Sequence, residues 1–580
     1  MKTMSDNKAN ISKNKYFIPT ILMIIYICIS MAIVLVVKFN TTTEDTKVSI
    51  TTNNGDEAFL NGKYDVAISE YNSLQGKEEW PVWNLRIGEI YSVQGDYKKS
   101  NELIQKVYDT RNKIMDTQKV NIEDYKQKDK ELANSIVFNS FMNGEFKKSS
   151  EYGEMFMQSY PDDVNLLKTM FAVYIANNET AKAEDIINIF MNENSDSDKL
   201  VIAGKMKLFI GKYEDGLKLL EEAYKINENN INIFDALEDV SRYNKNTIID
   251  SINKLIEKDK NNQSYKLFLA KIYSLSSSDI VKCQEIMNEL EGEFSDNTNY
   301  LFIKVKINAE ANDKKEIEKA LDEIIDINEG TFIGEYAQAM KFYYEGKYED
   351  ALKSAKKTIM LNGNYVKTYS SLIPSIAFKQ NKLLEEEPYI RIALNKEPFN
   401  FDFMITAAEY YKEVLQDSSK GMYYYTMASK INPNNSEVYY KMALIQYNNQ
   451  RVDEAVELLK KSISLNGKEP KYYRTLGSIY LEKNKNEEGM TEIRKAYELN
   501  KSDVATLNNA AYYYIYVEHN VNRAMTNIKG AFEGIDETVS NTEKQIITDN
   551  YNRIKVLYDS SRNNNSSNNA GVVSEVKLIY

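Results

Sequence analysis

The chain has very few of the residues that form disulfides, metal sites or catalytic bases. Its 580 residues include two cysteines and one histidine. Cys28 lies inside an apolar run, which makes a disulfide with Cys283 implausible, and no cluster with metal-ligand spacing is present. We interpret Cys283 as a small buried helix residue. We expect His519 to be exposed at a turn, because a histidine-based nucleophile would need partners that are missing.

Proline, glycine and net positive charge are also scarce. Eight prolines and 22 glycines in this length argue against a turn-rich β architecture, and the phosphate-binding sequence G-x-x-x-x-G-K is absent. Hydrophobic residues make up 43% and charged residues 27%, as in a folded protein. The net charge of −12 predicts an acidic surface that repels phosphate backbones, so we expect no nucleic-acid ligand.

One long apolar run is present, at residues 17–37. It carries no charge and would form a helix about 30 Å long, enough to cross a bilayer. No small-x-small cleavage site follows it, which favours an uncleaved anchor over a signal peptide. Four lysines precede it, so the positive-inside rule places residues 1–16 in the cytosol and the remainder on the extracytoplasmic side. The prediction is a single-pass cell-membrane protein with a polar tether at 38–54.

A seven-residue phrase recurs along the remainder. It reads GKYDVAI at 62–68, GKYEDGL at 211–217 and GKYEDAL at 346–352. Equivalent turn positions are Gly144, Asn178 and Gly211, spaced by 34 and 33 residues, and the pair Gln450 and Asn484, spaced by 34. A period near 34 residues, with two helices and two turns per unit, is typical of tetratricopeptide arrays. In such a unit the turn residue is left-handed and the phrase serves packing, so we leave it out of the functional residues.

The letters between these turns resemble the tetratricopeptide signature. In residues 471–500 its slots hold Tyr473, Leu476, Gly477, Tyr480, Gly489 and Ala496. In residues 84–108 they hold Asn84, Ile87, Gly88, Tyr91, Gly95, Tyr97 and Ser100. The small residues, such as Gly204 and Gly477, are expected where the two helices of a unit cross closely. Some units drift: residues 231–255 lack the small residues, and Pro374 falls inside a first helix.

The resemblance covers roughly residues 55–533 and implies an all-α fold, an α-solenoid of about fourteen stacked helical hairpins behind the membrane helix. Residues 112–132 are predicted to be a helix extension or a connecting insert, and 534–561 a capping helix. Residues 562–580 are predicted to be a flexible C-terminal tail. Its last stretch, VVSEVKLIY, could be a peptide offered to a partner, but we interpret it as a frayed end.

The function is predicted to lie in the concave groove that the first helices of the hairpins form in this family. Mapped onto the C-terminal units, the slots that line it are Tyr440, Leu444, Tyr447, Lys471, Arg474, Ser478, Asn508, Tyr512 and Ile515. Tyrosine and arginine commonly anchor interfaces. The family's clamp for acidic chain ends is not expected, because its slots hold Tyr440 and Leu444.

The hypothesis is therefore a membrane-anchored scaffold that binds protein or peptide partners, with no enzymatic activity, cofactor or metal. The alternatives are an envelope transport or assembly factor, a glycan-assembly accessory protein whose aromatic groove stacks sugars, and a cytosolic adaptor if the topology is reversed. The sequence leaves the partner and the oligomeric state open.

Overall fold

The computed structural model describes residues 53–77, 80–117, 122–192, 195–562 and 575–580. All of them belong to one compact unit, Thr51–Tyr580. The predicted N-terminal segment at 1–16, the apolar run at 17–37 and nearly all of the tether at 38–54 lie outside the described residues.

Helices fill most of the described chain. The first group is α2 (Asn54–Leu60), α3 (Tyr64–Leu74), α4 (Val82–Gln94), α5 (Tyr97–Thr117), α6 (Ile122–Met142), α7 (Phe146–Ser159), α8 (Val164–Ala176), α9 (Thr180–Phe190), α10 (Ser197–Phe209), α11 (Tyr213–Ile226) and α12 (Ile231–Lys258). The second is α13 (Gln263–Tyr273), η1 (Ser277–Asp279), α14 (Ile280–Phe294), α15 (Thr298–Glu310), α16 (Lys314–Ile327), α17 (Phe332–Tyr344), α18 (Tyr348–Leu361), η2 (Thr368–Leu372), α19 (Ile373–Lys379), η3 (Leu383–Glu385) and α20 (Glu387–Lys396). The third is α21 (Phe401–Glu409), η4 (Tyr410–Val414), α22 (Ser418–Ile431), α23 (Ser436–Asn448), α24 (Val452–Leu465), α25 (Pro470–Glu482), α26 (Asn486–Leu499), α27 (Val504–Tyr516), α28 (Val521–Glu533) and α29 (Asn541–Arg562).

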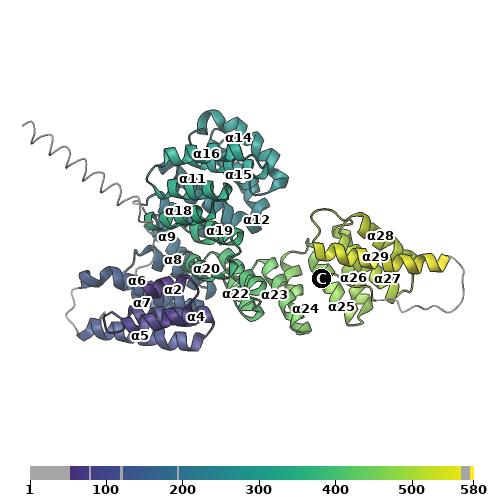
Figure 1. The fold of residues 1–580 in the computed structure, drawn as a ribbon, viewed down its shortest axis with the longest axis horizontal. Coiled ribbons are helices and arrows are strands. Elements are labelled where there is room, and N and C mark those ends of the chain that lie inside the picture. The colour runs from purple at the N-terminus through teal and green to yellow at the C-terminus, as the bar shows by residue number, and fades with distance from the viewer. Residues whose placement is uncertain (1–52, 78–79, 118–121, 193–194, 563–574) are drawn as a thin grey trace, which may run out of the picture. The chain divides into compact units, whose positions relative to one another are not determined.

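Consecutive helices pair into antiparallel hairpins, and each hairpin packs on the next (Figure 1). The pairs run from α2 with α3 to α27 with α28, and α29 packs on the last pair. No strand occurs among the described residues, so the expected all-α architecture of stacked hairpins is confirmed. Stacking is required because a single hairpin cannot bury its own apolar face.

The turns within the hairpins have the conformation that the repeated phrase predicts. The residues that carry it have φ between 59° and 85° and are Gly62, Gly95, Gly144, Asn178, Gly211, Gly346, Gln450 and Asn484. Glycine and asparagine tolerate this left-handed region better than other residues do. His519 takes the same conformation between α27 and α28 and is exposed, as expected. The phrase is thus the connection of a hairpin.

Close helix crossings account for the small residues. A Cβ atom added at Gly477 on α25 would lie 2.8 Å from the carbonyl oxygen of Gly489 on α26. A Cβ at Gly204 on α10 would lie 3.0 Å from the carbonyl oxygen of Gly216 on α11. The helix backbones touch at these points, so any larger residue would force the hairpin apart. Cys283 is fully buried on α14, as predicted, and its thiol donates to the Ala270 carbonyl.

Three units depart from the regular pattern. In α12 the turn between the paired helices is reduced to a kink at Asn244, where φ is −129° and ψ is 23°. At Pro374 the first helix is broken into the π-helix η2 and the short α19, which begins beside the proline. Around 112–132, helices α5 and α6 are both extended. A buried ion pair joins them, with Arg111 Nη2 at 2.6 Å from Asp129 Oδ2.

Helices far apart in the sequence also pack together. α20 contacts α2 and α8, and α22 contacts α8. The buried residues of α8 include every position from Leu166 to Tyr174, so neighbouring elements cover this helix on every side. One hydrophobic core contains residues from 80 to 206 together with residues from 369 to 445. The inner side of the early hairpins is therefore filled by later helices of the same chain.

The predicted localisation requires a correction. Within the stretches that the structure describes, no helix combines the length and the apolar character needed to span a bilayer. The prediction of a single-pass membrane protein with its hairpins on the extracytoplasmic side is therefore not supported and is withdrawn.

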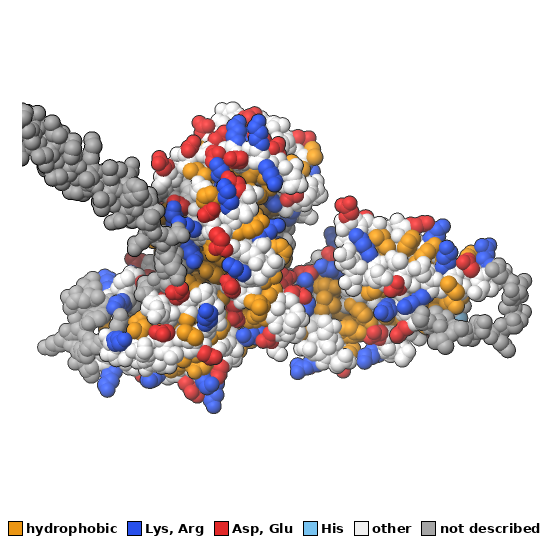
Figure 2. All heavy atoms as spheres, in the orientation of Figure 1, with side chains coloured by type: hydrophobic (Ala, Val, Ile, Leu, Met, Phe, Trp, Pro, Cys, Tyr) orange, Lys and Arg blue, Asp and Glu red, His pale blue; other side chains and the backbone are white. Residues whose placement is uncertain are grey.

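On the face shown in Figure 2, acidic and basic side chains are interspersed.

Candidate functional site

The residues predicted to line a groove lie on three first helices, α23, α25 and α27. Some of them serve the packing of the hairpins themselves. Tyr440 is buried against the Tyr472 ring, with 5.1 Å between the ring centroids. Lys471 forms an ion pair with Glu437 at 2.8 Å, and Arg474 pairs with Asp503 at 2.7 Å. Leu444 packs in the same core as Tyr440. These four contribute mainly to structure.

The other predicted residues lie beside an extended segment of the chain itself. Residues 575–580, here named the docked segment, run along α29, α27 and α25. In Figure 1 the C-terminus accordingly lies beside α25 and α26. The exposed fractions of Val576, Leu578 and Ile579 are 0%, 9% and 4%. The frayed end predicted for the last residues is therefore not what the structure shows, because these apolar side chains are covered by the hairpins.

Asparagine side chains hold the backbone of the docked segment at every second residue. The Lys577 N–H donates to Asn550 Oδ1 at 3.0 Å, and Asn550 Nδ2 donates to the Lys577 carbonyl at 2.8 Å. Asn509 repeats the arrangement on Ile579, whose N–H donates to Asn509 Oδ1 at 2.8 Å while Asn509 Nδ2 donates to its carbonyl. A side-chain amide presents the same donor and acceptor pair as a backbone amide, so each asparagine replaces a neighbouring β-strand.

Further polar groups complete this ladder. Asn508 Nδ2 also donates to the Lys577 carbonyl, at 2.9 Å, and the Ser478 hydroxyl donates to the Ile579 carbonyl at 3.2 Å. The Val576 N–H donates to the Tyr516 hydroxyl at 2.8 Å. Asn508 in turn accepts a hydrogen bond from Asn550 at 2.8 Å, which fixes the orientation of both amides. All of these contacts to the segment address backbone atoms.

The apolar side chains of the docked segment pack into two separate hydrophobic clusters. Val576 and Ile579 join the core formed by α27, α28 and α29. Leu578 enters a cluster that contains Leu481 and Ile493. The side chains of Glu575 and Lys577 are exposed. From Glu575 to Leu578 exposed and buried side chains alternate with the period of two expected for an extended backbone, and Ile579 interrupts this alternation because it is also buried.

The last residue of the segment meets two polar groups. The Tyr580 and Tyr447 hydroxyls both donate to the carboxylate of Glu482, and the two rings lie 4.9 Å apart between centroids. Burial, and then the bond to Glu482, raises the pKa of Tyr580 well above its usual value. Burial raises the pKa of Tyr447 to about 12. Both phenols therefore stay protonated and donate at neutral pH.

Sequence reasoning placed part of this site. Ser478 and Asn508 bind the docked segment, Tyr447 packs on Tyr580, and Tyr512 is half-buried beside Tyr516. The residues it missed are Asn509, Asn550, Glu482 and Tyr516. A signal for one of them was present, because asparagine is a poor helix former and two consecutive asparagines stand in the middle of α27. Because these asparagines destabilise the helix, their presence indicates a role in an interaction outside it.

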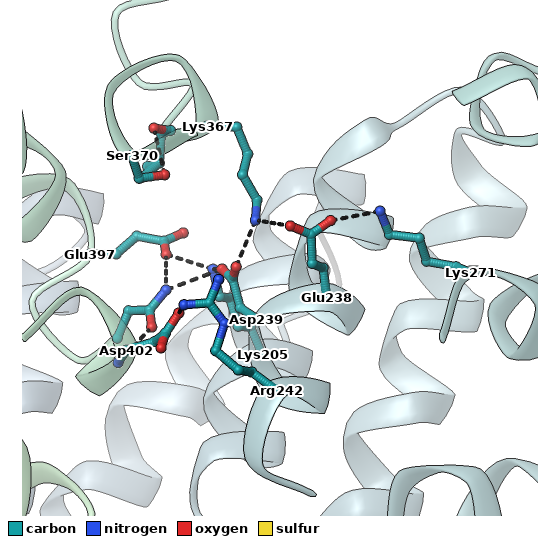
Figure 3. Close-up of polar contacts among 11 residues, drawn as sticks. Lys205, Glu238, Asp239, Arg242, Lys271, Lys367, Ser370, Glu397 and Asp402 are labelled. Atoms are coloured by element: carbon teal, nitrogen blue, oxygen red, sulfur yellow. Dashed lines mark hydrogen bonds and ion pairs between the residues drawn. The ribbon is translucent and has the colours of Figure 1, made fainter. Parts of the chain in front are cut away.

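A second candidate is the cluster of buried charges shown in Figure 3. Lys205 on α10 contacts Asp239 at 2.6 Å and Glu397 at 2.5 Å. Lys367, just before η2, contacts Asp239 at 2.8 Å and Glu238 at 2.9 Å. Burial by itself raises the pKa of Asp239, but the two lysines outweigh it and hold that pKa below its usual value. The cluster joins α10 and α12 to residues more than a hundred positions later.

A cavity of about 480 Å³ adjoins this cluster. Lys168 and Asp235 both line it. Burial lowers the pKa of Lys168 to about 8 and raises the pKa of Asp235 to about 6. The lining carries charges of both signs, so its charge favours neither anions nor cations. Within the described residues, no group of three or more His, Cys, Asp or Glu side chains is placed to hold a metal ion.

Comparisons with known proteins add little to this geometry. No family model and no curated protein matches the chain. Among solved structures, yeast Tom70 covers 83% of this chain and 94% of its own, with 16% identity and a TM-score of 0.34. PilF of Pseudomonas aeruginosa covers 40% and 98%, with 13% identity and a TM-score of 0.30. YrrB, described as a TPR protein with an unusual peptide-binding site, covers 33% and 98%, with 17% identity and a TM-score of 0.27. Values this low carry no argument about function.

Proposed function

We propose that this protein is a helical-repeat scaffold that binds extended polypeptide segments in the groove formed by α23, α25, α27 and α29. The observation that supports this function is the docked segment, which lies in the groove as an extended chain with its backbone paired to Asn509 and Asn550. A groove that binds backbone atoms accepts a polypeptide of another sequence in the same way, provided that its side chains fit.

The helices of the groove also contact one another directly, independently of the segment. α25 packs against α26 and α27, and α27 packs against α28 and α29. A preformed site binds at a lower entropic cost than one that must be assembled. The polar lining at Ser478, Asn508, Asn509 and Asn550 is buried in the presence of the segment. A partner segment would supply the backbone groups that these side chains need.

The test selects ligands on a full-length variant, Val576→Asp with Ile579→Asp, which we name the open variant. Two buried charges would expel the docked segment and leave the groove free. A random peptide library is selected on this protein, and the affinity of each selected peptide is measured by fluorescence polarisation.

We expect Asn550→Ala, added to the open variant, to weaken the selected peptides about tenfold whatever their sequence, since it removes two backbone hydrogen bonds. Asn522→Ala is the matched control, because Asn522 is an exposed asparagine on α28. If no peptide is selected, or if the selected peptides bind the Asn550→Ala protein unchanged, the proposed function is wrong.

A further inference from the structure

The groove is occupied, and the occupant belongs to the same chain. The docked segment buries Val576 and Ile579 and contributes Tyr580 to a pair of hydrogen bonds on Glu482. Any partner that uses the same backbone ladder must first take the place of this segment. The chemistry of the segment therefore also describes what the groove accepts.

We propose that the docked segment is a displaceable internal competitor, and that the partner is an extended segment with its side-chain pattern. This inference rests on the proposed function. The pattern is an apolar residue at the position of Val576, apolar residues at those of Leu578 and Ile579, and a tyrosine at that of Tyr580. The positions of Glu575 and Lys577 are free, because these side chains are exposed.

The two kinds of contact in the groove contribute differently to recognition, one to affinity and the other to sequence selectivity. The hydrogen bonds from Asn509 and Asn550 hold any backbone, so they supply affinity without choosing a sequence. Sequence selectivity comes from the apolar contact sites of Val576, Leu578 and Ile579 and from Glu482. Its carboxylate accepts from the Tyr447 and Tyr580 hydroxyls, so it favours a donor and repels an acidic side chain at the last position.

The covalent connection decides how strongly the segment competes. Residues 563–574 join it to the end of α29, which makes its binding intramolecular. A short tether gives an effective concentration in the millimolar range. The apparent affinity of a free peptide falls in proportion to the fraction of molecules whose groove is open. A peptide of micromolar intrinsic affinity therefore binds the unchanged chain at least about tenfold more weakly than it binds an open groove.

The segment can leave without unfolding the hairpins. Its contacts come from its own side chains and backbone, whereas α25, α27 and α29 hold one another directly. This differs from α20 and α22, whose side chains belong to the largest hydrophobic core. Displacement therefore requires loss of the segment's own contacts only.

The experiment uses a fluorescein-labelled synthetic peptide of sequence EVKLIY, measured by fluorescence polarisation against the full-length protein and the open variant. We expect at least about tenfold tighter binding to the open variant. A full-length Lys577→Ala protein is the matched control and should bind the peptide as weakly as the unchanged chain. A peptide with Glu in place of its tyrosine should bind the open variant at least about tenfold more weakly.

A second measurement does not depend on the open variant being folded. Hydrogen exchange of residues 575–580 is followed by mass spectrometry in the unchanged chain, with and without excess EVKLIY made from heavy isotopes. We expect the peptide to abolish the protection of the Lys577 and Ile579 amides, since both donate to asparagine in the docked state.

The outcomes separate this inference from the proposed function. Equal affinity for both proteins, or protection that persists under saturating peptide, would show that the segment does not compete, while the groove could still bind selected library peptides. Failure of EVKLIY where library peptides of another pattern bind would overturn the partner chemistry alone. If the library also yields no peptide, the proposed function itself is wrong.

Discussion

The inner side of the hairpins is covered in two ways in two regions of this molecule. Between residues 53 and 431, helices α20 and α22 pack against α2 and α8, and buried ion pairs join Lys205 and Lys367 to distant carboxylates. Between residues 436 and 562, six residues in extended conformation cover the groove, and asparagines hold their backbone. We name these the closed region and the groove region.

The difference lies in what each contact recognises. In the closed region each charged group meets particular side chains of distant helices: Arg391 donates to Ser92 and Asn139, and the Glu387 carboxylate accepts from Tyr64. A buried charge without that partner is costly, so the closure admits one arrangement of one chain. In the groove region an amide meets any backbone. The first kind of contact suits a permanent closure, and the second suits exchange of ligands.

The largest effect is expected from breaking the charge cluster of the closed region. Lys205→Met would leave Glu397 and Asp239 without a shared cation in a buried place. We expect unfolding of this region to become easier by about 3–5 kcal/mol, since Glu397 loses the lysine that it contacts and Asp239 keeps only Lys367. Urea denaturation and hydrogen exchange of α10 and α12 measure the change.

Lys460→Met is the control for this change, because Lys460 and Glu457 form an exposed pair worth less than about 1 kcal/mol. Protection of the docked segment should not change with either substitution. A loss below 1 kcal/mol for Lys205→Met would remove the distinction between the two regions.

The second effect is a dependence on pH that only the closed region should show. Glu386, at the start of α20, is 8% exposed, and burial raises its pKa from 4.5 to about 7. The protonated form therefore favours the folded state. Its contribution to stability is complete below about pH 4.5 and is lost as the pH rises through 7.

Glu386→Gln should remove the part of this dependence that comes from Glu386, while Asp235 and Lys168 continue to titrate in both proteins. The variant and the unchanged chain should be equally stable at pH 4, and the variant should be more stable by about 3 kcal/mol at pH 8. Urea denaturation at each pH gives the difference, and Glu385→Gln, at an exposed position one residue earlier, should show none. A constant difference across this range would contradict the assignment.

The smallest effect separates the groove region from its own helices. Asn509→Ala removes the paired bonds to Ile579 and the bond to Ser478. Hydrogen-exchange protection of Ile579 should fall about tenfold, equivalent to about 1.4 kcal/mol. The stability of α27 should stay the same or rise slightly, since alanine is the better helix former.

In this last experiment Asn522→Ala should leave the protection of the docked segment unchanged. Loss of protection throughout α25–α29 in Asn509→Ala would mean that the segment is part of the fold of these hairpins. The comparison with the closed region would then fail.

The sequence pattern predicted the hairpins well, because it records contacts between near neighbours. The left-handed turns at Gly211 and Gln450 and the close crossing at Gly477 each involve residues within one unit. The same register placed Ser478 and Asn508 in a predicted groove, and both contact the docked segment, while their use by a partner stays a prediction. Asn550 could not be found in this way, because it lies on α29, which departs from the repeat.

What the sequence by itself determined is therefore the helical hairpin, its turns and its order along the chain. Only the tertiary structure decided what covers the inner side of the hairpins. Lys205 meets Glu397, 192 positions later, and Ile579 meets Asn509, 70 positions earlier. The first meeting depends on the summed rotation of each hairpin on the next, which the kink at Asn244 and the broken helix at Pro374 both change. A local sequence pattern therefore specifies each hairpin, whereas the summed rotation of the hairpins is determined only in the folded chain.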